Sequence, residues 1–127
     1  MSANVAKSVL IVDDSQVVRK ALSRLFTWQP DFGVCGEAQN GREAIEKAQQ
    51  LHPDLIIMDL SMPLMNGLDA ARTLKRLMPK VPIIMYSDYS DFLREGRPTA
   101  GISAMVSKSD KVSTLLTRAR TLVEKAA

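Results

Sequence analysis

The sequence contains a single cysteine, Cys35, and a single histidine, His52. One cysteine excludes an internal disulfide and a cysteine-based metal cluster. Because His52 precedes Pro53 in a predicted loop, we interpret it as a turn residue rather than a phosphodonor or a ligand. Apolar runs reach only about five residues, whereas a membrane span needs roughly 20. Residues 1–4 show no signal-peptide pattern, so we expect a cytoplasmic protein.

The chain has no large excess of charge of either sign and no low-complexity segment. Its formal net charge is +3 and its basic residues are interspersed, so we expect no direct nucleic-acid binding and no membrane association. The 127 residues, 46% of them hydrophobic, suffice for one domain with a real core. We therefore expect a single domain over residues 1–127, with no output domain in this chain.

Hydrophobic residues follow two different periods along the chain. Short apolar runs predict five buried strands, and apolar residues at helical spacing predict five helices between and after them. The predicted strands cover residues 8–12, 34–38, 54–58, 81–86 and 102–106, and the predicted helices cover residues 17–26, 41–51, 67–78, 90–97 and 112–123. Asn40 is expected to cap the second helix, with Glu43 three residues further on. Five strand–helix units predict an α/β fold, a parallel sheet with helices on both faces.

Aspartates directly follow two of these strands: Asp13 and Asp14 follow the first, and Asp59 follows the third. Neighbouring parallel strands bring their carboxyl ends to one edge of the sheet, where open α/β sheets bind ligands. At 4 Å and an effective dielectric of 20, one pair of like charges repels by about 4 kcal/mol. A hard, oxygen-liganded cation such as magnesium relieves this repulsion. We therefore predict a small acidic magnesium site around Asp59.

Two more polar residues stand at predicted strand ends: Ser87 directly follows the fourth strand, and Lys108 lies shortly after the fifth. Each residue of the set also has an ordinary explanation of its own. Acids favour helix N-termini, aspartate is common in turns, and most lysines are solvated surface groups. The shared position at strand ends favours one constellation of three acids, a hydroxyl and an amine over these separate explanations.

This constellation resembles the receiver domain of bacterial two-component response regulators. The matching segments are Val12-Asp13-Asp14-Ser15, Met58-Asp59-Leu60-Ser61-Met62-Pro63 with Asn66-Gly67, Tyr86-Ser87 and Ser107-Lys108, and the resemblance covers essentially the whole chain. It implies a flavodoxin-like (βα)5 three-layer sandwich with strand order 2-1-3-4-5. It also implies phosphoryl transfer from a sensor histidine kinase, or a histidine phosphotransfer protein, to one aspartate.

The same resemblance gives each acidic residue a role. Asp59 would be the phosphoacceptor, and a carboxylate is a competent nucleophile toward phosphorus. Mg2+ (or Mn2+) would be held by Asp14, by Asp59 and by the backbone carbonyl of Ser61, with Asp13 acting through water. Little covalent chemistry is asked of the protein, because positioning and charge neutralisation do most of the work in phosphoryl transfer.

Ser87 and Lys108 would contact phosphoryl oxygens, and Lys108 would also pair with Asp59 before phosphorylation. Two nearby positions depart from the family pattern. The residue after Ser87 is usually small, but Asp88 stands here as a candidate gate at the site entrance. Three residues before the lysine, the family often has a Tyr or Phe that rotates inward on activation. Met105 takes that place here, so an aromatic switch is not expected at this position.

The favoured hypothesis is a phosphoacceptor switch, a signalling domain that transfers phosphoryl only to itself and loses it slowly. An unidentified output protein or domain would bind the face formed by residues 90–97, the fifth strand and the 112–123 helix, and that last helix is a candidate dimer surface. The alternative is a degenerate receiver that binds partners without phosphorylation, which Asp88 and Met105 keep open. A small hydrolase with an aspartyl intermediate is less favoured, because the sequence lacks the acid–base residues for rapid turnover.

Overall fold

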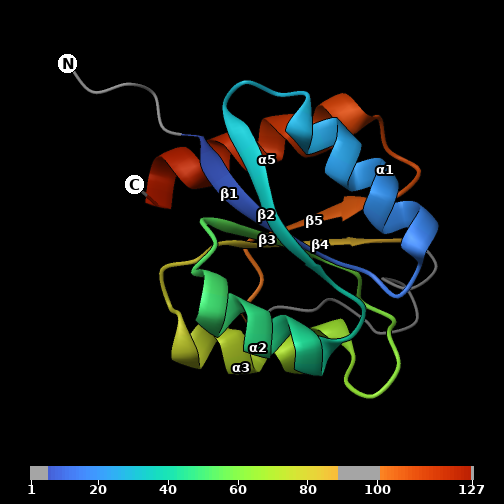
Figure 1. Cartoon of the computed structure of the whole chain (residues 1–127), viewed down its shortest axis with the longest axis vertical. Helices are drawn as coiled ribbons and strands as arrows, with labels where there is room; N and C mark the ends of the chain where they lie inside the picture. The colour runs from blue at the N-terminus through green and yellow to red at the C-terminus, as the bar shows by residue number, and fades with distance from the viewer. Residues whose placement is uncertain (1–5, 89–100, 127) are drawn as a thin grey trace.

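The computed structural model of the chain describes residues 6–88 and 101–126 (Figure 1). In chain order the elements are β1 (Lys7–Val12), α1 (Gln16–Thr27), β2 (Phe32–Ala38), α2 (Gly41–Leu51), β3 (Leu55–Met58), α3 (Gly67–Leu77), β4 (Ile83–Ser87), β5 (Ala104–Ser107) and α5 (Val112–Ala126). The helix predicted at residues 90–97 lies outside the described residues. Within the described ranges, every helix is too short or too polar to cross a membrane.

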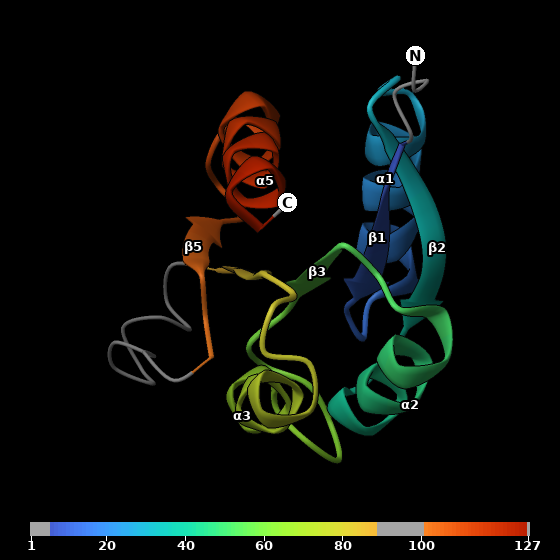
Figure 2. The same cartoon turned by 90° about the vertical axis from the view of Figure 1, so that its left-hand side faces the viewer.

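The five strands form one parallel sheet in the order β2-β1-β3-β4-β5, which confirms the predicted flavodoxin-like topology. Helices α1 and α5 cover one face of the sheet, and α2 and α3 cover the other (Figures 1 and 2). The central strand β3 is buried at all four positions and shows no polar alternation, because helices cover both of its faces. This arrangement brings the carboxyl ends of β1, β3, β4 and β5 to one edge of the molecule.

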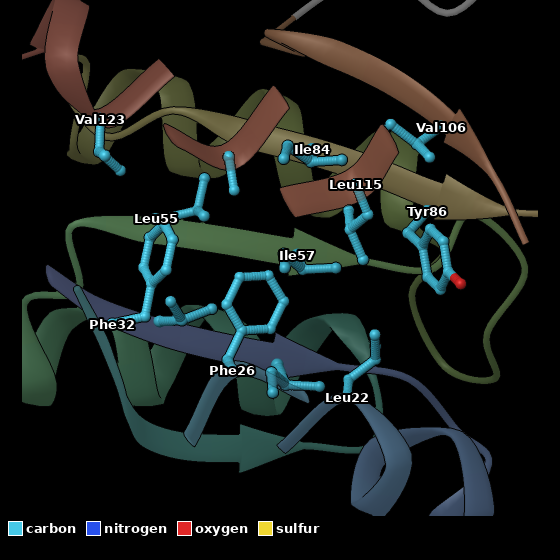
Figure 3. Packing of buried hydrophobic residues seen from close by; sticks show 13 residues of the cluster. Leu22, Phe26, Phe32, Leu55, Ile57, Ile84, Tyr86, Val106, Leu115 and Val123 are labelled. Atoms are coloured by element: carbon cyan, nitrogen blue, oxygen red, sulfur yellow. The ribbon is translucent and has the colours of Figure 1, made fainter. Parts of the chain in front are cut away.

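The core is divided by the sheet into two layers. Between the sheet and α1/α5, Phe26 and Phe32 meet edge to face with ring centroids 5.1 Å apart, beside Ile57 and Leu115 (Figure 3). The layer between the sheet and α2/α3 is built largely from small and aliphatic residues, namely Leu10, Val12, Ala38, Ala44, Ala48, Ile56, Met58, Leu60, Ala70, Ala71, Leu74, Ile83 and Met85. The alanines allow α2 and α3 to approach the sheet closely.

Side-chain caps start three of the helices. The side chain of Asn40 accepts a 2.9 Å hydrogen bond from the backbone N–H of Glu43, as predicted for the start of α2. Asn66 caps α3 in the same way, and Ser15 caps α1. At the other end of α2, His52 adopts a left-handed conformation with φ of 49°. His52 is therefore the residue that ends the helix, in agreement with its interpretation as a turn residue.

Strand β2 contains one residue more than its partner at a single point. Val34 lies opposite Val9, but Leu10 lies opposite Gly36, so Cys35 is an extra residue in the ladder. Such a β-bulge changes which face the following residues point to. The Cys35 thiol donates to the Val9 carbonyl at 3.4 Å, and partial burial raises its pKa.

The apolar face of α1 is only partly covered. Leu22 and Phe26 are buried, but Val17 is 79% exposed, and Trp28 at the end of the helix is 80% exposed. Both residues line an apolar groove of about 570 Å³ whose lining also includes Tyr86. Val17 therefore lies outside the core, because the sheet covers a narrower stripe of α1 than the apolar residues at helical spacing span.

Replacing Phe26 with Ala should lower the free energy of unfolding by about 3–5 kcal/mol, because it removes a fully buried ring that packs on Phe32. Val17→Ala, on the exposed side of the same helix, should change it by less than about 0.5 kcal/mol. Urea unfolding followed by circular dichroism measures both. Equal losses in the two variants would contradict this division of α1 into a buried and an exposed side.

Candidate functional site

The site lies at the carboxyl ends of β1, β3, β4 and β5, where backbone hydrogen bonds extend the sheet beyond the strands. The N–H of Asp13 donates to Ala38 at 3.0 Å, and the N–H of Asp59 donates to Val12 at 2.9 Å. Both aspartates are therefore fixed by the sheet itself rather than by a free loop. The parallel order of the strands is the reason that residues 46 positions apart in the sequence meet here.

The three predicted acids are brought together. One carboxylate oxygen from each of Asp13, Asp14 and Asp59 lies within 4.8 Å of the others. Asp13 and Asp59 are 1% and 6% exposed, whereas Asp14 faces solvent. Two buried carboxylates and one accessible carboxylate suit a hard cation that keeps some of its water. The donor set therefore fits Mg2+ or Mn2+.

Lys108 supplies positive charge beside these acids. Its Nζ lies 2.8 Å from Oδ2 of Asp13 and 3.4 Å from Oδ2 of Asp59. Burial acts to lower the pKa of Lys108, but the two carboxylates act more strongly together and raise it above its usual value. The predicted pairing of Lys108 with Asp59 is present in the geometry, and the closer partner is Asp13, which the sequence did not indicate.

A short hydrogen bond joins Ser87 and Asp59, with Ser87 Oγ donating to Asp59 Oδ1 at 2.6 Å. Burial raises the pKa of the Asp59 carboxyl, and the charge of Asp13 adds to this effect. The Ser87 hydroxyl and the ammonium of Lys108 act in the opposite direction without cancelling it. The carboxylate of Asp59 is thus held in place by hydrogen bonding while its negative charge remains poorly compensated.

The loop after β3 carries Ser61, whose backbone carbonyl was predicted to bind the metal. Ser61 is exposed two residues after Asp59, and its backbone also hydrogen-bonds the Asp59 carboxyl, which helps to lower that pKa. The loop returns to the site because Gly67 donates to the Leu60 carbonyl at 2.8 Å. A Cβ at Gly67 would lie 2.2 Å from the carbonyl oxygen of Asp59, so only glycine allows this close approach.

The two positions that depart from the family pattern lie in different environments. Asp88 follows β4 and is exposed, beside the buried Ser87. Met105 is half-buried against the layer of α2 and α3, whereas Tyr86 packs in the opposite layer with α1 and α5. The aromatic ring nearest to Ser87 in sequence therefore lies across the sheet from Met105.

One part of the site was missed in the sequence. Arg19 of α1 donates from Nη1 to the backbone carbonyl of Asp13 at 2.7 Å and from Nε to Oε1 of Glu37 at 3.2 Å. The only sequence signal was a basic residue on α1 six positions after Asp13. Its partner Glu37 belongs to β2, so this contact depends on tertiary structure.

Comparison with known proteins agrees with this geometry. The family model of the response regulator receiver domain matches residues 9–120, so the chain belongs to this family of two-component signalling domains. The predicted family and fold are confirmed.

Individual relatives include a chemotaxis protein and a methylesterase. Over 81 residues the chain is 46% identical to the chemotaxis protein CheY of Thermotoga maritima, covering 64% of this chain and 67% of that protein. Over 78 residues it is 51% identical to protein-glutamate methylesterase/protein-glutamine glutaminase 1 of Methanosarcina acetivorans, covering 61% of this chain. The chain spans only 22% of that relative's length. The crystal structure of the response regulator domain of Thermotoga maritima CheB aligns with a TM-score of 0.74 and 30% identity over 96% of both chains.

Asp59→Asn should stabilise the metal-free protein at neutral pH. Because burial raises the pKa of Asp59 in the folded protein, ionisation of this carboxyl opposes folding above its unfolded pKa. The gain should therefore be full near neutral pH and should disappear as the pH falls toward about 4, the ordinary aspartate value. Urea unfolding in the presence of a chelator, repeated between these pH values, measures it. Asp69→Asn, which changes an exposed carboxylate on α3, is the control and should bring no gain in stability. A pH-independent gain in the stability of Asp59→Asn would contradict the electrostatic cause.

Proposed function

We propose that the chain is a phosphoacceptor switch that takes a phosphoryl group from a sensor histidine kinase, or from a histidine phosphotransfer protein, onto Asp59. The observation that carries this proposal is the surroundings of one carboxylate. Asp59 receives a 2.6 Å hydrogen bond from Ser87 on one oxygen and faces Lys108 at 3.4 Å with the other. The relatedness to CheY and to the response regulator domain of CheB supports the same role.

In the proposed reaction, a carboxylate oxygen of Asp59 attacks the phosphorus of a phosphohistidine. The P–N bond breaks, its electron pair stays on the imidazole nitrogen, and an acyl phosphate forms on Asp59. Lys108 and Ser87 then lie within reach of the new phosphoryl oxygens, as a cation and a hydroxyl donor. These side chains are in place before the reaction, so positioning requires little rearrangement.

The acids of the site would hold Mg2+ or Mn2+ through Asp14, Asp59 and the carbonyl of Ser61, with Asp13 acting through water. When bound, the cation supplies charge neutralisation on the phosphoryl oxygens. Three carboxylates face a single ammonium here, so the site carries an excess of negative charge that a divalent cation would offset.

Switching would start from Ser87 and Lys108, which are joined by a backbone hydrogen bond of 2.9 Å between the Lys108 N–H and the Ser87 carbonyl. A phosphoryl group that draws both side chains inward moves the ends of β4 and β5 together. We propose that an output protein or domain reads this change on the face of β5 and α5. Residues 90–97, which were predicted to share this face, lie outside the described residues. A bias of a few kcal/mol suffices to exchange minor and major conformers.

A receiver that works without phosphorylation is the weaker candidate. Asp88 and Met105 motivate it, since both depart from the family pattern. The complete arrangement of acids around Lys108 argues against it, because a pure interaction module needs no cation site and no buried nucleophile.

Asp59 should be the sole residue that gains a phosphoryl group from a small phosphodonor such as acetyl phosphate, and the reaction should need a divalent cation. Asp59→Asn should abolish the mass increase of one phosphoryl group, because the nucleophile is lost. Asp69→Asn, with an exposed carboxylate on α3, should react like the wild type. Intact-mass spectrometry with magnesium or with a chelator measures this, and equal phosphorylation of Asp59→Asn would refute the proposal.

Asp88→Ala should react several-fold to tenfold faster with a small anionic donor at low salt, because it removes an exposed negative charge adjacent to Ser87. Salt screens exposed charges, so the gain should shrink as ionic strength rises. Phosphorylation rates at several salt concentrations test this. Equal rates at every ionic strength would show that Asp88 is not an electrostatic gate.

A further inference from the structure

Arg19 lies beside the acid site and contacts its backbone rather than its carboxylates. The guanidinium Nη1 donates to the carbonyl of Asp13 at 2.7 Å, and only 14% of the Arg19 side chain is exposed. The phosphoryl chemistry proposed above makes no use of this residue. Its hydrogen bond to the turn between β1 and α1 nevertheless connects Arg19 to the two aspartates that this turn carries.

The carbonyl that Arg19 holds belongs to the peptide unit between Asp13 and Asp14. Because this unit is planar, fixing its oxygen also fixes the N–H and Cα of Asp14, the atoms from which the Asp14 side chain extends. Asp13 has further anchors, since its Oδ1 accepts from the Ser15 N–H at 2.9 Å and its side chain is buried. Asp14 is exposed and gains no such orientation from packing.

Arg19 is itself held in place by Glu37 of β2. Oε1 of Glu37 accepts from Nε of Arg19 at 3.2 Å, and Oε2 accepts from the hydroxyl of Ser23 at 3.1 Å. Lys47 donates to the backbone carbonyl of the same Glu37. A planar guanidinium can donate hydrogen bonds to the Asp13 carbonyl and to Glu37 at the same time, which the ammonium of a lysine cannot do with the same geometry. Glu37 also balances the positive charge of Arg19, so that charge opposes a bound cation less.

We propose that Arg19 is a positioning residue for the cation site, which orients Asp14 through the Asp13–Asp14 peptide and is itself oriented by Glu37. This role rests on the proposed function, because it concerns the cation that Asp14 would bind. The competing explanation is an ion pair that only anchors α1 to β2. The two explanations differ in what happens to cation affinity.

Removal of the Arg19 charge distinguishes the two explanations, because they predict changes of Mg2+ affinity in opposite directions. If only electrostatics mattered, Arg19→Met would remove a nearby positive charge and strengthen binding of Mg2+. A loss of positioning has the opposite effect, and substitution of residues that orient metal ligands weakens metal affinity by roughly 10- to 100-fold. We therefore expect about tenfold weaker Mg2+ binding to Arg19→Met by calorimetry, with Mn2+ binding by electron paramagnetic resonance as a second readout.

Arg24→Met is the matched control, because it removes the same charge from an exposed position of the same helix. Its affinity should stay within about twofold of the wild type. Arg19→Lys keeps the charge and most of the stem but not the fork, so it should also weaken binding. Amide exchange in the metal-free protein should speed up at Asp14 and Ser15 in both Arg19 variants and not in Arg24→Met.

Mg2+ affinity of Arg19→Met that equals or exceeds the wild-type affinity would overturn the role of Arg19 and leave the proposed function intact. Wild-type protein that binds neither cation would instead refute the proposed cation site. If Arg19→Met loses stability, Arg19→Lys decides the question. A folded Arg19→Lys variant with wild-type affinity and wild-type exchange at Asp14 would equally overturn the proposal.

Discussion

The ammonium of Lys108 is the charge on which the whole carboxyl edge of the sheet depends. It follows β5 at one end of the strand order, yet its Nζ reaches Asp13 after β1 and Asp59 after β3. One side chain thus connects residues from three strands across the end of β4. Without it, two buried carboxylates would face each other uncompensated, and at short range such repulsion amounts to several kcal/mol.

One ammonium compensates the carboxylate charges incompletely, but backbone hydrogen bonds hold both buried aspartates in place. Asp13 and Asp59 continue the hydrogen-bonded ladder of the sheet, and Gly67 closes the following loop onto Leu60. The buried carboxylates of the proposed site are therefore held by the hydrogen-bonded ends of strands. The exposed Asp14 is the exception, and its orientation depends on a neighbouring side chain instead of on the ladder.

Most of the architecture could be predicted from the chain because local signals and the fold agree. Apolar runs indicated each strand, and Asn40 marked the start of α2. Strand β4 begins at Ile83 rather than at residue 81, since Pro82 has no N–H to donate to a ladder. The common position of Asp13 and Asp59 after their strands sufficed to predict that they meet.

Other features could not be read from spacing alone. Helical periodicity shows which residues of α1 share a side, but it does not show how wide a stripe the sheet covers, so the exposure of Val17 could not be predicted from it. The preference of Lys108 for Asp13 depends on side-chain paths across the strand ends. The contact between Arg19 and Glu37 joins a helix to a strand 18 residues away, and no local pattern marks it.

The extra residue Cys35 in β2 decides which layer of the protein receives Glu37. Val34 packs in the layer of α1 and α5, and strict alternation would then direct Glu37 toward the apolar layer of α2 and α3. Because the bulge adds one residue, Glu37 instead meets Arg19 on α1, and Ala38 enters the apolar layer. If the same residues paired without the bulge, a carboxylate and a methyl group would exchange layers. The position of the bulge in this edge strand therefore determines which face of the sheet receives each of the residues that follow it.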